Sequence, residues 1–418
     1  MLKFTIYNAD VFDGLKCIES NSVDCVVTSP PYFRLRDYGV EGQIGLEGNP
    51  KEWIQKMVAV MREVRRVLKP TGSAWLNVGD TYFAKRPKDN VKDDYYGPGR
   101  DGGHPTSMVP DGSGWLQPKQ KMLMPHRLAI ALQDDGWIVR NDVCWFKPSH
   151  LPSSVKDRLT NSFEFIFHLV KSKKYFYDLD AIREPHQVGA QPFNYRVRSV
   201  AEGKIKSAQY HASESEIAYR MQLRSLKEYG GKESPQGTIK SFDVEGGKNP
   251  FDFWKISSEP YPESHFAVFP TELVRRPLLA TCPKWICKKC GKPRQRIVEK
   301  KPINIRKHEL HKGRLKDAVD GNNPQYQVHG YERTGVQFEY DRKTVGWSDC
   351  GCGAGWTSGV VLDPFVGSGT TLQVAQELGL NGIGIELNPN YIKFIKARLN
   401  GDKFQQSLNE NKIEVIVP

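Results

Sequence analysis

The sequence predicts an α/β fold built on a Rossmann-like, mostly parallel sheet. Two stretches carry this prediction, because each alternates buried strands with an amphipathic helix. In the first, the apolar run VDCVV precedes a helix expected over 51–68, and the strand SAWLNV follows. In the second, the strand GVVLDPF, the helix TTLQVAQELGL and the strand NGIGIEL follow one another. Strands that alternate with helices pair in parallel, so we expect both stretches to share one sheet.

The other elements are read from shorter patterns along the chain. FTIYNAD predicts a strand near the N-terminus, and residues 124–135 predict a helix. WIVRNDVCWFK and SFEFIFHLVKS predict two more strands, the second with apolar residues alternating on one face. The last predicted helix, NPNYIKFIKARLN, has Asn388 at its N-cap and Pro389 in its first turn.

The composition favours a polyanionic partner and argues against a membrane. The 418 residues include 60 Lys and Arg against 48 Asp and Glu, a formal net charge of +12. Lys and Arg near phosphates release condensed counterions, so this excess favours nucleic acid. There is no run of about 18 apolar residues that would predict a membrane span. The N-terminus lacks a signal-peptide pattern, so we expect a cytoplasmic protein.

The first chemical motif is Thr28-Ser29-Pro30-Pro31-Tyr32, which follows the apolar run VDCVV. It therefore lies at the carboxyl end of a strand, where open α/β sheets bind ligands. Two prolines supply no N–H donors, which leaves backbone carbonyls free to accept hydrogen bonds. Ser29 Oγ and the Pro30 carbonyl can both accept from one amino group, and Tyr32 offers a face for a base. The alternative is a structural Pro-Pro turn capped by Ser.

The second motif is DPFVGSGTT, from Asp363 to Thr371, between a predicted strand and a predicted helix. Its glycines let the backbone approach a ligand, and the helix N-terminus favours polar or anionic groups. Glu386 ends the next predicted strand, where a carboxylate can accept both hydroxyls of a ribose. This order of elements indicates a nucleoside-containing cofactor.

Together the two motifs resemble the DNA amino-methyltransferases that use S-adenosylmethionine. The motif order, with SPPY first and the Gly-rich motif last, is similar to the β group of that family. The resemblance covers roughly residues 1–183 and 255–400. It implies a seven-stranded methyltransferase sheet in circularly permuted order. It also implies a target-amine site at Ser29, Pro30, Pro31 and Tyr32. The cofactor site that it implies comprises Asp10, Phe269, Thr271, Asp363, Phe365, Gly367, Gly369, Thr370 and Glu386.

The same resemblance implies a reaction on double-stranded DNA. The target base leaves the helix, and its amine is methylated without a covalent intermediate. Ser at position 29 is typical of enzymes that act on cytosine N4, whereas Asp or Asn is typical of adenine N6 enzymes. A catalytically dead nucleic-acid-binding protein and an RNA or protein methyltransferase are the rival readings. The recognition sequence, a cognate restriction endonuclease and a homodimer stay open, and we expect a prokaryotic or phage enzyme near the nucleoid.

Five of the eight Cys lie between positions 282 and 352. In a chain without an export signal, clustered Cys indicates metal before disulfide. Cys287 and Cys290 form a CxxC half-site, and Cys350 and Cys352 form a CxC half-site. Four thiolates from two Gly-containing turns suit tetrahedral zinc, so we expect a structural zinc ion. Reduced thiols without metal are the alternative. Cys282 is an alternative ligand, although CPKW fits better as the end of the preceding element.

These observations divide the chain into five segments. Residues 84–120 and 186–250 are polar and weakly periodic, so they read as a loop and an insertion. Within the second, Arg196, Arg198, Arg220 and Arg224 are candidates for DNA contacts. The catalytic domain is expected in three pieces: a target-amine half at 1–185, a return at 253–281 and a cofactor-binding half at 357–418. Between them we expect a target-recognition insertion at 186–252 and a zinc-binding insertion at 282–356.

Overall fold

A computed structural model describes residues 2–85, 108–109, 116–150, 152–184, 249–259, 269–303, 339–400 and 412–418. Most of the loop expected over 84–120 lies outside these residues. So does nearly all of the expected target-recognition insertion, including its four named arginines. In the part of the chain that is described, no helix is both long enough and apolar enough to cross a membrane.

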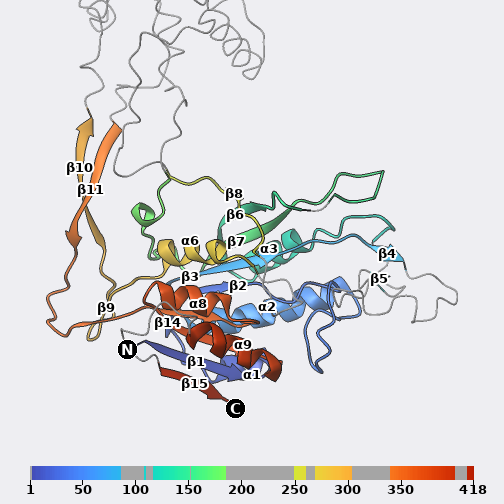
Figure 1. Cartoon of the computed structure of the whole chain (residues 1–418), viewed down its shortest axis with the longest axis horizontal. Coiled ribbons are helices and arrows are strands. Elements are labelled where there is room, and N and C mark those ends of the chain that lie inside the picture. The colour runs from blue at the N-terminus through green and yellow to red at the C-terminus, as the bar shows by residue number, and fades with distance from the viewer. Residues whose placement is uncertain are drawn as a thin grey trace, which may run out of the picture. The chain divides into compact units, whose positions relative to one another are not determined.

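A large sheet organises the described residues, in the order β15-β1-β14-β13-β2-β3-β7-β6-β8 (Figure 1). All neighbouring strands run parallel except β7, which is antiparallel to both β3 and β6. The strands are β1 Lys3–Asn8, β2 Val23–Thr28, β3 Leu68–Val78, β6 Ile138–Phe146, β7 Phe163–Val170, β8 Phe253–Lys255, β13 Val360–Asp363, β14 Asn381–Glu386 and β15 Lys412–Ile416. The mostly parallel α/β fold is confirmed, and edge strands β8 and β15 add to the seven strands expected.

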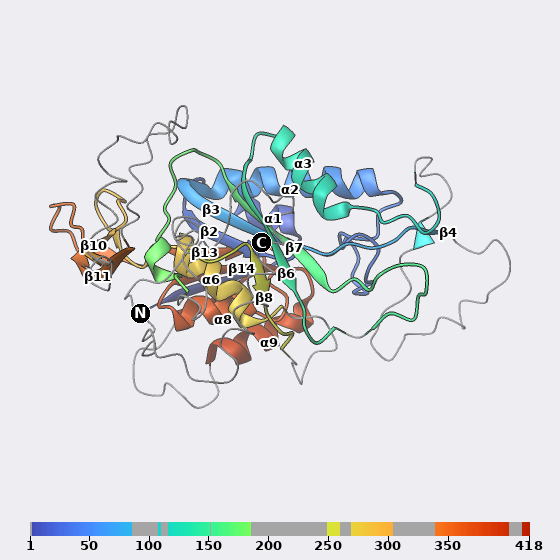
Figure 2. The same ribbon diagram turned by 90° about the horizontal axis from the view of Figure 1, so that it is seen from above.

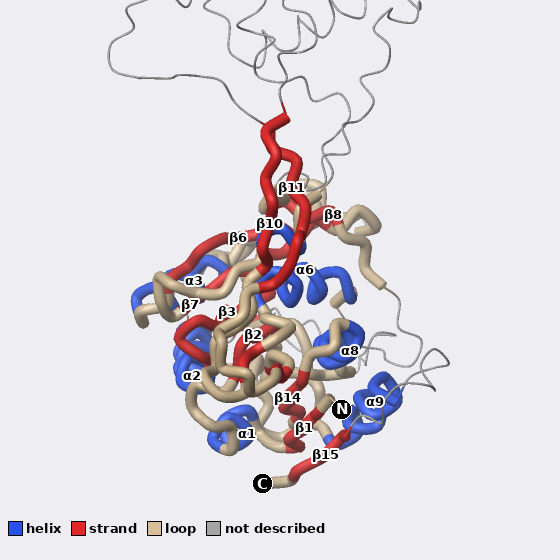
Figure 3. The backbone as a smooth tube through the Cα atoms, turned by 90° about the vertical axis from the view of Figure 1, so that its left-hand side faces the viewer, coloured by secondary structure: helices blue, strands red, loops and turns tan. Residues whose placement is uncertain are grey.

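Helices cover both faces of this sheet (Figures 2 and 3). One layer packs with the apolar cluster that contains Trp53, Leu76 and Leu128, and the other with the cluster that contains Val274, Leu372 and Ile395. Because both faces are covered, the interior strands read as continuous apolar runs. The first layer consists of α1 Val11–Lys16, α2 Pro50–Val67 and α3 Met124–Asp134. The second layer consists of α6 Thr271–Thr281, α8 Thr370–Glu377 and α9 Pro389–Asn400.

Helix α2 shows how local sequence sets these elements. Asn49 caps it by accepting a hydrogen bond from the Glu52 amide at 3.1 Å, and Pro50 occupies its first turn. Its buried face repeats at helical spacing from Trp53 to Val67, as the sequence predicts. Trp53 Nε1 then donates to the Pro31 carbonyl at 3.0 Å, so this helix holds the SPPY segment in place.

The chain divides into two compact units. The first comprises Met1–Ile182, Pro250–Arg296 and Trp347–Pro418, and the second comprises Arg183–Asn249 and Ile297–Gly346. The first unit contains the whole sheet and all four Cys of the predicted zinc site. The smaller described elements are β4 Ala84–Lys85, β5 Met108–Val109, the 3-10 helix η2 Leu179–Ala181, β9 Ile286–Cys287, β10 Arg296–Ile303, β11 Glu339–Trp347 and β12 Trp356–Thr357.

Candidate active site

The two motifs meet at one edge of the sheet. Strands β2 and β13 are parallel neighbours, so the segments that follow their carboxyl ends lie together. A cavity of about 730 Å³ opens there, lined by Ser29, Pro30, Pro31 and Tyr32 from the first motif. The second motif contributes Phe365, Gly367 and Thr370 to the same cavity, and Asp10, Phe269 and Glu386 line it as well.

Asp363 joins the two motifs but does not line the cavity. Its fully buried carboxylate accepts hydrogen bonds from Thr28 Oγ1 and Thr371 Oγ1, both at 2.6 Å, and from the Phe365 amide at 3.0 Å. Burial raises the pKa of this carboxyl to about 6, against the lowering effect of those donors. Asp363 therefore fixes the Gly-rich turn to the end of the SPPY strand.

Glu386 stands at the end of β14, facing the Gly-rich turn. Its two carboxylate oxygens accept from the amides of Gly367 at 2.9 Å and Asn388 at 2.8 Å. Burial raises the pKa of Glu386 to about 7. Gly367 has φ +53° and lines the cavity, and the nearest atom to a Cβ there would be the Phe365 carbonyl oxygen at 4.0 Å. The turn thus leaves room for a ligand next to a carboxylate.

The remaining cofactor candidates divide into those at the cavity and those away from it. Thr370 lines the cavity, and its Oγ1 atom is buried without a hydrogen-bond partner among the described residues. Asp10 caps α1, accepting from the Phe12 amide at 2.8 Å, and also lines the cavity. Gly369 instead packs on α9, where a Cβ would lie 3.2 Å from Ile395. Thr271 binds the Glu259 carboxylate at 2.9 Å and does not line the cavity.

Four side chains form a hydrogen-bonded network at the target-amine end of the cavity. Ser29 Oγ donates to the Tyr32 hydroxyl at 3.1 Å, and that hydroxyl donates to Glu164 Oε2 at 2.8 Å. Asn77 Nδ2 donates to the same hydroxyl at 2.7 Å and to Glu164 Oε2 at 2.9 Å. Burial and the adjacent Glu164 carboxylate raise the pKa of Tyr32 well above its usual range, so the phenol keeps its proton.

Sequence reasoning missed Glu164, Lys147 and Asn77, all of which line the cavity. Lys147 Nζ forms an ion pair with Glu164 Oε1 and lies 4.2 Å from the centre of the Trp145 ring. The available signal was a lone carboxylate within the mostly apolar run SFEFIFHLV. Its side chain is only 18% exposed, which is unusual for Glu.

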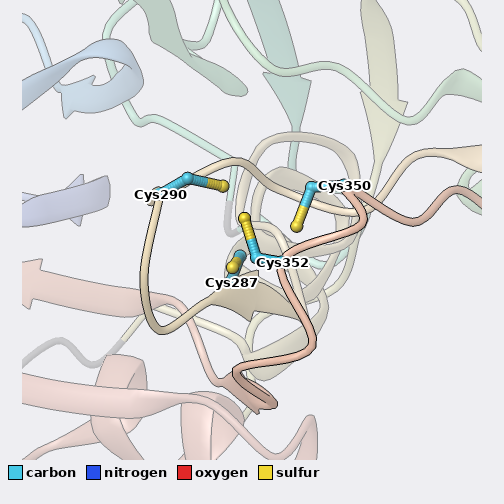
Figure 4. A group of neighbouring side chains, drawn as sticks. All are labelled: Cys287, Cys290, Cys350 and Cys352. Atoms are coloured by element: carbon cyan, nitrogen blue, oxygen red, sulfur yellow. The ribbon is translucent and has the colours of Figure 1, made fainter.

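The four predicted metal ligands converge in the first unit (Figure 4). The Sγ atoms of Cys287, Cys290, Cys350 and Cys352 all lie within 4.8 Å of one another. Strand β9 carries Cys287 and pairs antiparallel with β12, which brings the two half-sites together. Cys282 is not part of this group; it is buried at the C-terminal end of α6.

The glycines of the cluster have the conformation that the turns require. Gly291, Gly351 and Gly353 follow Cys290, Cys350 and Cys352, with φ of +70°, +72° and +62°. Only glycine adopts this region without strain. Backbone amides of Cys290 and Lys289 lower the pKa of Cys287 to about 6, whereas hydrogen bonds with neighbouring thiols raise the pKa values of Cys350 and Cys352.

Comparison with known proteins finds relatives along most of the chain. The N6/N4 methyltransferase family, described as DNA methylase, matches residues 23–285 and 357–397. Type II methyltransferase M.SmaI of Serratia marcescens is 32% identical over 390 residues, 93% of this chain and 88% of that protein. Type II methyltransferase M.Cfr9I of Citrobacter freundii is 29% identical over 95% of this chain and 88% of that protein. The solved structure of PvuII DNA methyltransferase (cytosine-N4-specific) aligns with a TM-score of 0.48 and 15% identity, over 96% of this chain and 88% of that chain.

Proposed function

The chain belongs to the N6/N4 DNA methylase family, and from this premise we propose that it methylates the N4 amine of cytosine in duplex DNA, with S-adenosylmethionine as methyl donor. One observation carries the proposal. The SPPY segment and the Gly-rich turn, linked by Thr28 and Asp363 at a separation of 335 residues, line a single cavity. One end of that cavity offers acceptors for an amino group, and the other offers a carboxylate beside a Gly-rich turn.

The residues at the Gly-rich end fit S-adenosylmethionine. The Glu386 carboxylate can accept from ribose hydroxyls, and Gly367 leaves space for the approach. The unpartnered Thr370 hydroxyl and the Asp10 carboxylate supply further polar contacts. When bound, S-adenosylmethionine supplies a methyl group already activated by its sulfonium, so alignment contributes much of the rate.

At the other end, the chain holds the target amine. Ser29 Oγ and the Pro30 carbonyl accept its N–H groups and orient the nitrogen lone pair, while Tyr32 offers a face to the base. Asn77 Oδ1 is buried there without a partner among the described residues, and it provides a third acceptor. The base must leave the duplex to enter this cavity, which costs a few kcal/mol of unstacking.

The choice of cytosine rests on Ser29. A Ser at this position is typical of the family's cytosine N4 enzymes, and its hydroxyl is short and uncharged. Adenine N6 is the alternative, because Asp and Asn also accept from an amine. The alternative of a catalytically inactive nucleic-acid-binding protein has less support, because both the SPPY segment and the Gly-rich turn are intact and line the cavity.

The sheet supports a circularly permuted methyltransferase order. The strand of the target-amine motif, β2, precedes the cofactor strand β13 in the chain, although the two are sheet neighbours. We assign residues 186–252 to target recognition and 282–356 to a zinc-binding insertion. An origin in a prokaryote or phage, a cytoplasmic location, a homodimer and a restriction endonuclease partner stay predictions.

We also propose that the four clustered cysteines hold structural zinc. Zinc binds thiolates at about 2.3 Å, which separates sulfurs by about 3.8 Å in a tetrahedron. The observed limit of 4.8 Å between sulfurs is compatible with that arrangement. Zinc there is not required for methyl transfer; it would hold together two turns that are distant in sequence.

The proposed function is tested by methyl transfer from labelled S-adenosylmethionine. Duplex DNA of mixed sequence should take up label, whereas RNA and protein should not. Ser29→Ala should reduce the single-turnover rate by about 10²-fold, because it removes an acceptor from the reacting amine. Label in RNA alone, or full activity of Ser29→Ala, would contradict the proposal.

A further inference from the structure

Glu164 is a carboxylate at the target-amine end of the cavity, and it does not itself hold the target amine. It projects from β7, and all of its hydrogen-bond partners line the same cavity. Oε2 accepts from the Tyr32 hydroxyl at 2.8 Å and from Asn77 Nδ2 at 2.9 Å, and Oε1 faces the Lys147 ammonium. The side chains of Lys147 and Glu164 are 20% and 18% exposed, so the pair is largely withdrawn from solvent.

The hydrogen bonds around Tyr32 can run in only one direction. The phenol has a single proton, and an ionised carboxylate only accepts, so Tyr32 donates that proton to Glu164. The phenol oxygen must therefore accept from Ser29 Oγ, 3.1 Å away. With its own proton turned toward Tyr32, the Ser29 oxygen has two lone pairs. One faces Asn77 Nδ2 at 3.4 Å, and the other is available to an incoming N–H.

We propose that Glu164 is a positioning residue that orients the Ser29 hydroxyl through Tyr32 and finally takes up the proton released by the methylated amine. This inference rests on the proposed function. As the N–CH3 bond forms and the S–CH3 bond of the methyl donor breaks, the amine N–H proton moves to Ser29 Oγ. The Ser29 proton moves to the Tyr32 oxygen, and the Tyr32 proton moves to Glu164. The net change is one proton, from the amine to Glu164, and Ser29 and Tyr32 end as they began.

The two neighbours of Glu164 prepare this chain for its role. Lys147 forms an ion pair with the carboxylate before transfer and remains as a hydrogen-bond donor to it afterwards. Asn77 donates to both the Tyr32 oxygen and Glu164, at 2.7 and 2.9 Å, which fixes the distance between them. A purely structural ion pair would require neither the phenol between Ser29 and Glu164 nor the second donor.

The test compares Glu164→Gln, Tyr32→Phe and the double variant in single-turnover methyl transfer to duplex DNA. Each single variant should slow transfer by about 10²-fold, the typical contribution of a positioned proton acceptor. The double variant should be no slower than the slower single variant, because both changes break one chain. The dissociation constants for DNA and for S-adenosylmethionine should change less than threefold, since the effect belongs to kcat and not to KM.

Asp178→Asn is the matched control. Asp178 pairs with Arg296 at 3.0 Å, its side chain is 11% exposed, and it does not line the cavity. This variant should lower the thermal midpoint about as much as Glu164→Gln and leave the transfer rate unchanged. If Glu164→Gln does not fold, Tyr32→Phe decides, because it removes only one hydroxyl from the chain.

The outcomes separate the two proposals. Active wild-type protein with undiminished Glu164→Gln or Tyr32→Phe overturns the proton chain and leaves the proposed function standing. If the rate reductions of the two single variants multiply in the double variant, the proton chain is also overturned, because residues that act independently have multiplicative effects on rate. Wild-type protein that methylates no DNA overturns the proposed function itself, and the inference with it.

Discussion

Tyr32 packs against a backbone position that has no room for a side chain. A Cβ at Gly79 would lie 2.5 Å from Tyr32 Cε2 and 2.9 Å from Cδ2, which is far inside contact distance. The ring cannot retreat freely, because Asn77 and Glu164 hold its hydroxyl at 2.7 and 2.8 Å. The missing side chain at position 79 therefore keeps the phenol beside Ser29.

Gly79→Ala should consequently impair methyl transfer while the protein still folds. Displacing a positioned group by about 1 Å costs roughly 10²-fold in rate, and single-turnover kinetics would measure it. Gly346→Ala is the control, since a Cβ there meets nothing within 4 Å. Equal rates for the two variants would show that the position of the Tyr32 ring is irrelevant to the reaction.

Glu386 gives cofactor binding a pH dependence at the residue scale. Burial raises the pKa of its carboxyl from 4.5 to about 7 in the folded protein, so protonation is favoured below about pH 7. Ribose hydroxyls donate to the ionised form. Affinity for S-adenosylmethionine should therefore be full above pH 7 and fall as the pH drops through 7.

Calorimetric titration between pH 6 and 8 would measure this dependence. Glu386→Gln should bind more weakly at pH 8, and its affinity should be nearly flat across the range. In the protein without cofactor, the folded-state pKa lies above the unfolded value, so ionised Glu386 destabilises the fold above pH 7. That cost disappears as the pH falls toward 4.5. A wild-type affinity that is independent of pH would contradict the role assigned to Glu386.

At the scale of elements, the cysteine cluster joins two short turns that have little apolar core of their own. Cys287 lies on a two-residue strand, β9, which pairs with another two-residue strand, β12. Such short ladders are marginal alone. Metal binding to four converging thiolates would supply the missing stabilisation.

Protein purified without chelator should contain one zinc ion per chain. Cys290→Ser or prolonged chelation should lower the thermal midpoint by several degrees. Cys17→Ser should not, because Cys17 is an exposed cysteine outside the cluster. Metal analysis together with thermal unfolding provides both readouts. Absence of zinc, or equal stability of Cys290→Ser and Cys17→Ser, would exclude the metal site.

Elements with strong local periodicity could be predicted, and elements fixed by tertiary contacts could not. The buried residues of helix α2 recur at helical spacing, and those of strands β2 and β13 are consecutive, so these patterns sufficed. Helix α6 escaped prediction because Pro277 lies inside it, and β8 has only three residues.

The same contrast holds within the candidate site. Motif residues such as Ser29 and Glu386 were found from their order along the chain. Glu164 is 132 residues from Tyr32, and only the pairing of β7 with β3 brings it there. Gly369 resembles a ligand-binding glycine in sequence, but it packs on Ile395 in the structure.

At the scale of the whole molecule, parallel strands explain why the site forms where it does. Helical layers cover both faces of the sheet, and the carboxyl ends of β2, β13 and β14 converge on the cavity. The net charge of +12 favours association with a polyanion. Family membership, the shared cavity and the charge all support an enzyme that acts on DNA.

We propose that the residues of this cavity direct methylation of the N4 amine of cytosine. Duplex DNA treated with the enzyme and S-adenosylmethionine can be digested to nucleosides and measured by mass spectrometry, with Ser29→Ala as the reference. We expect N4-methylcytosine with the wild-type protein and far less with the variant. N6-methyladenine as the only product, or no methylated nucleoside, would contradict the account.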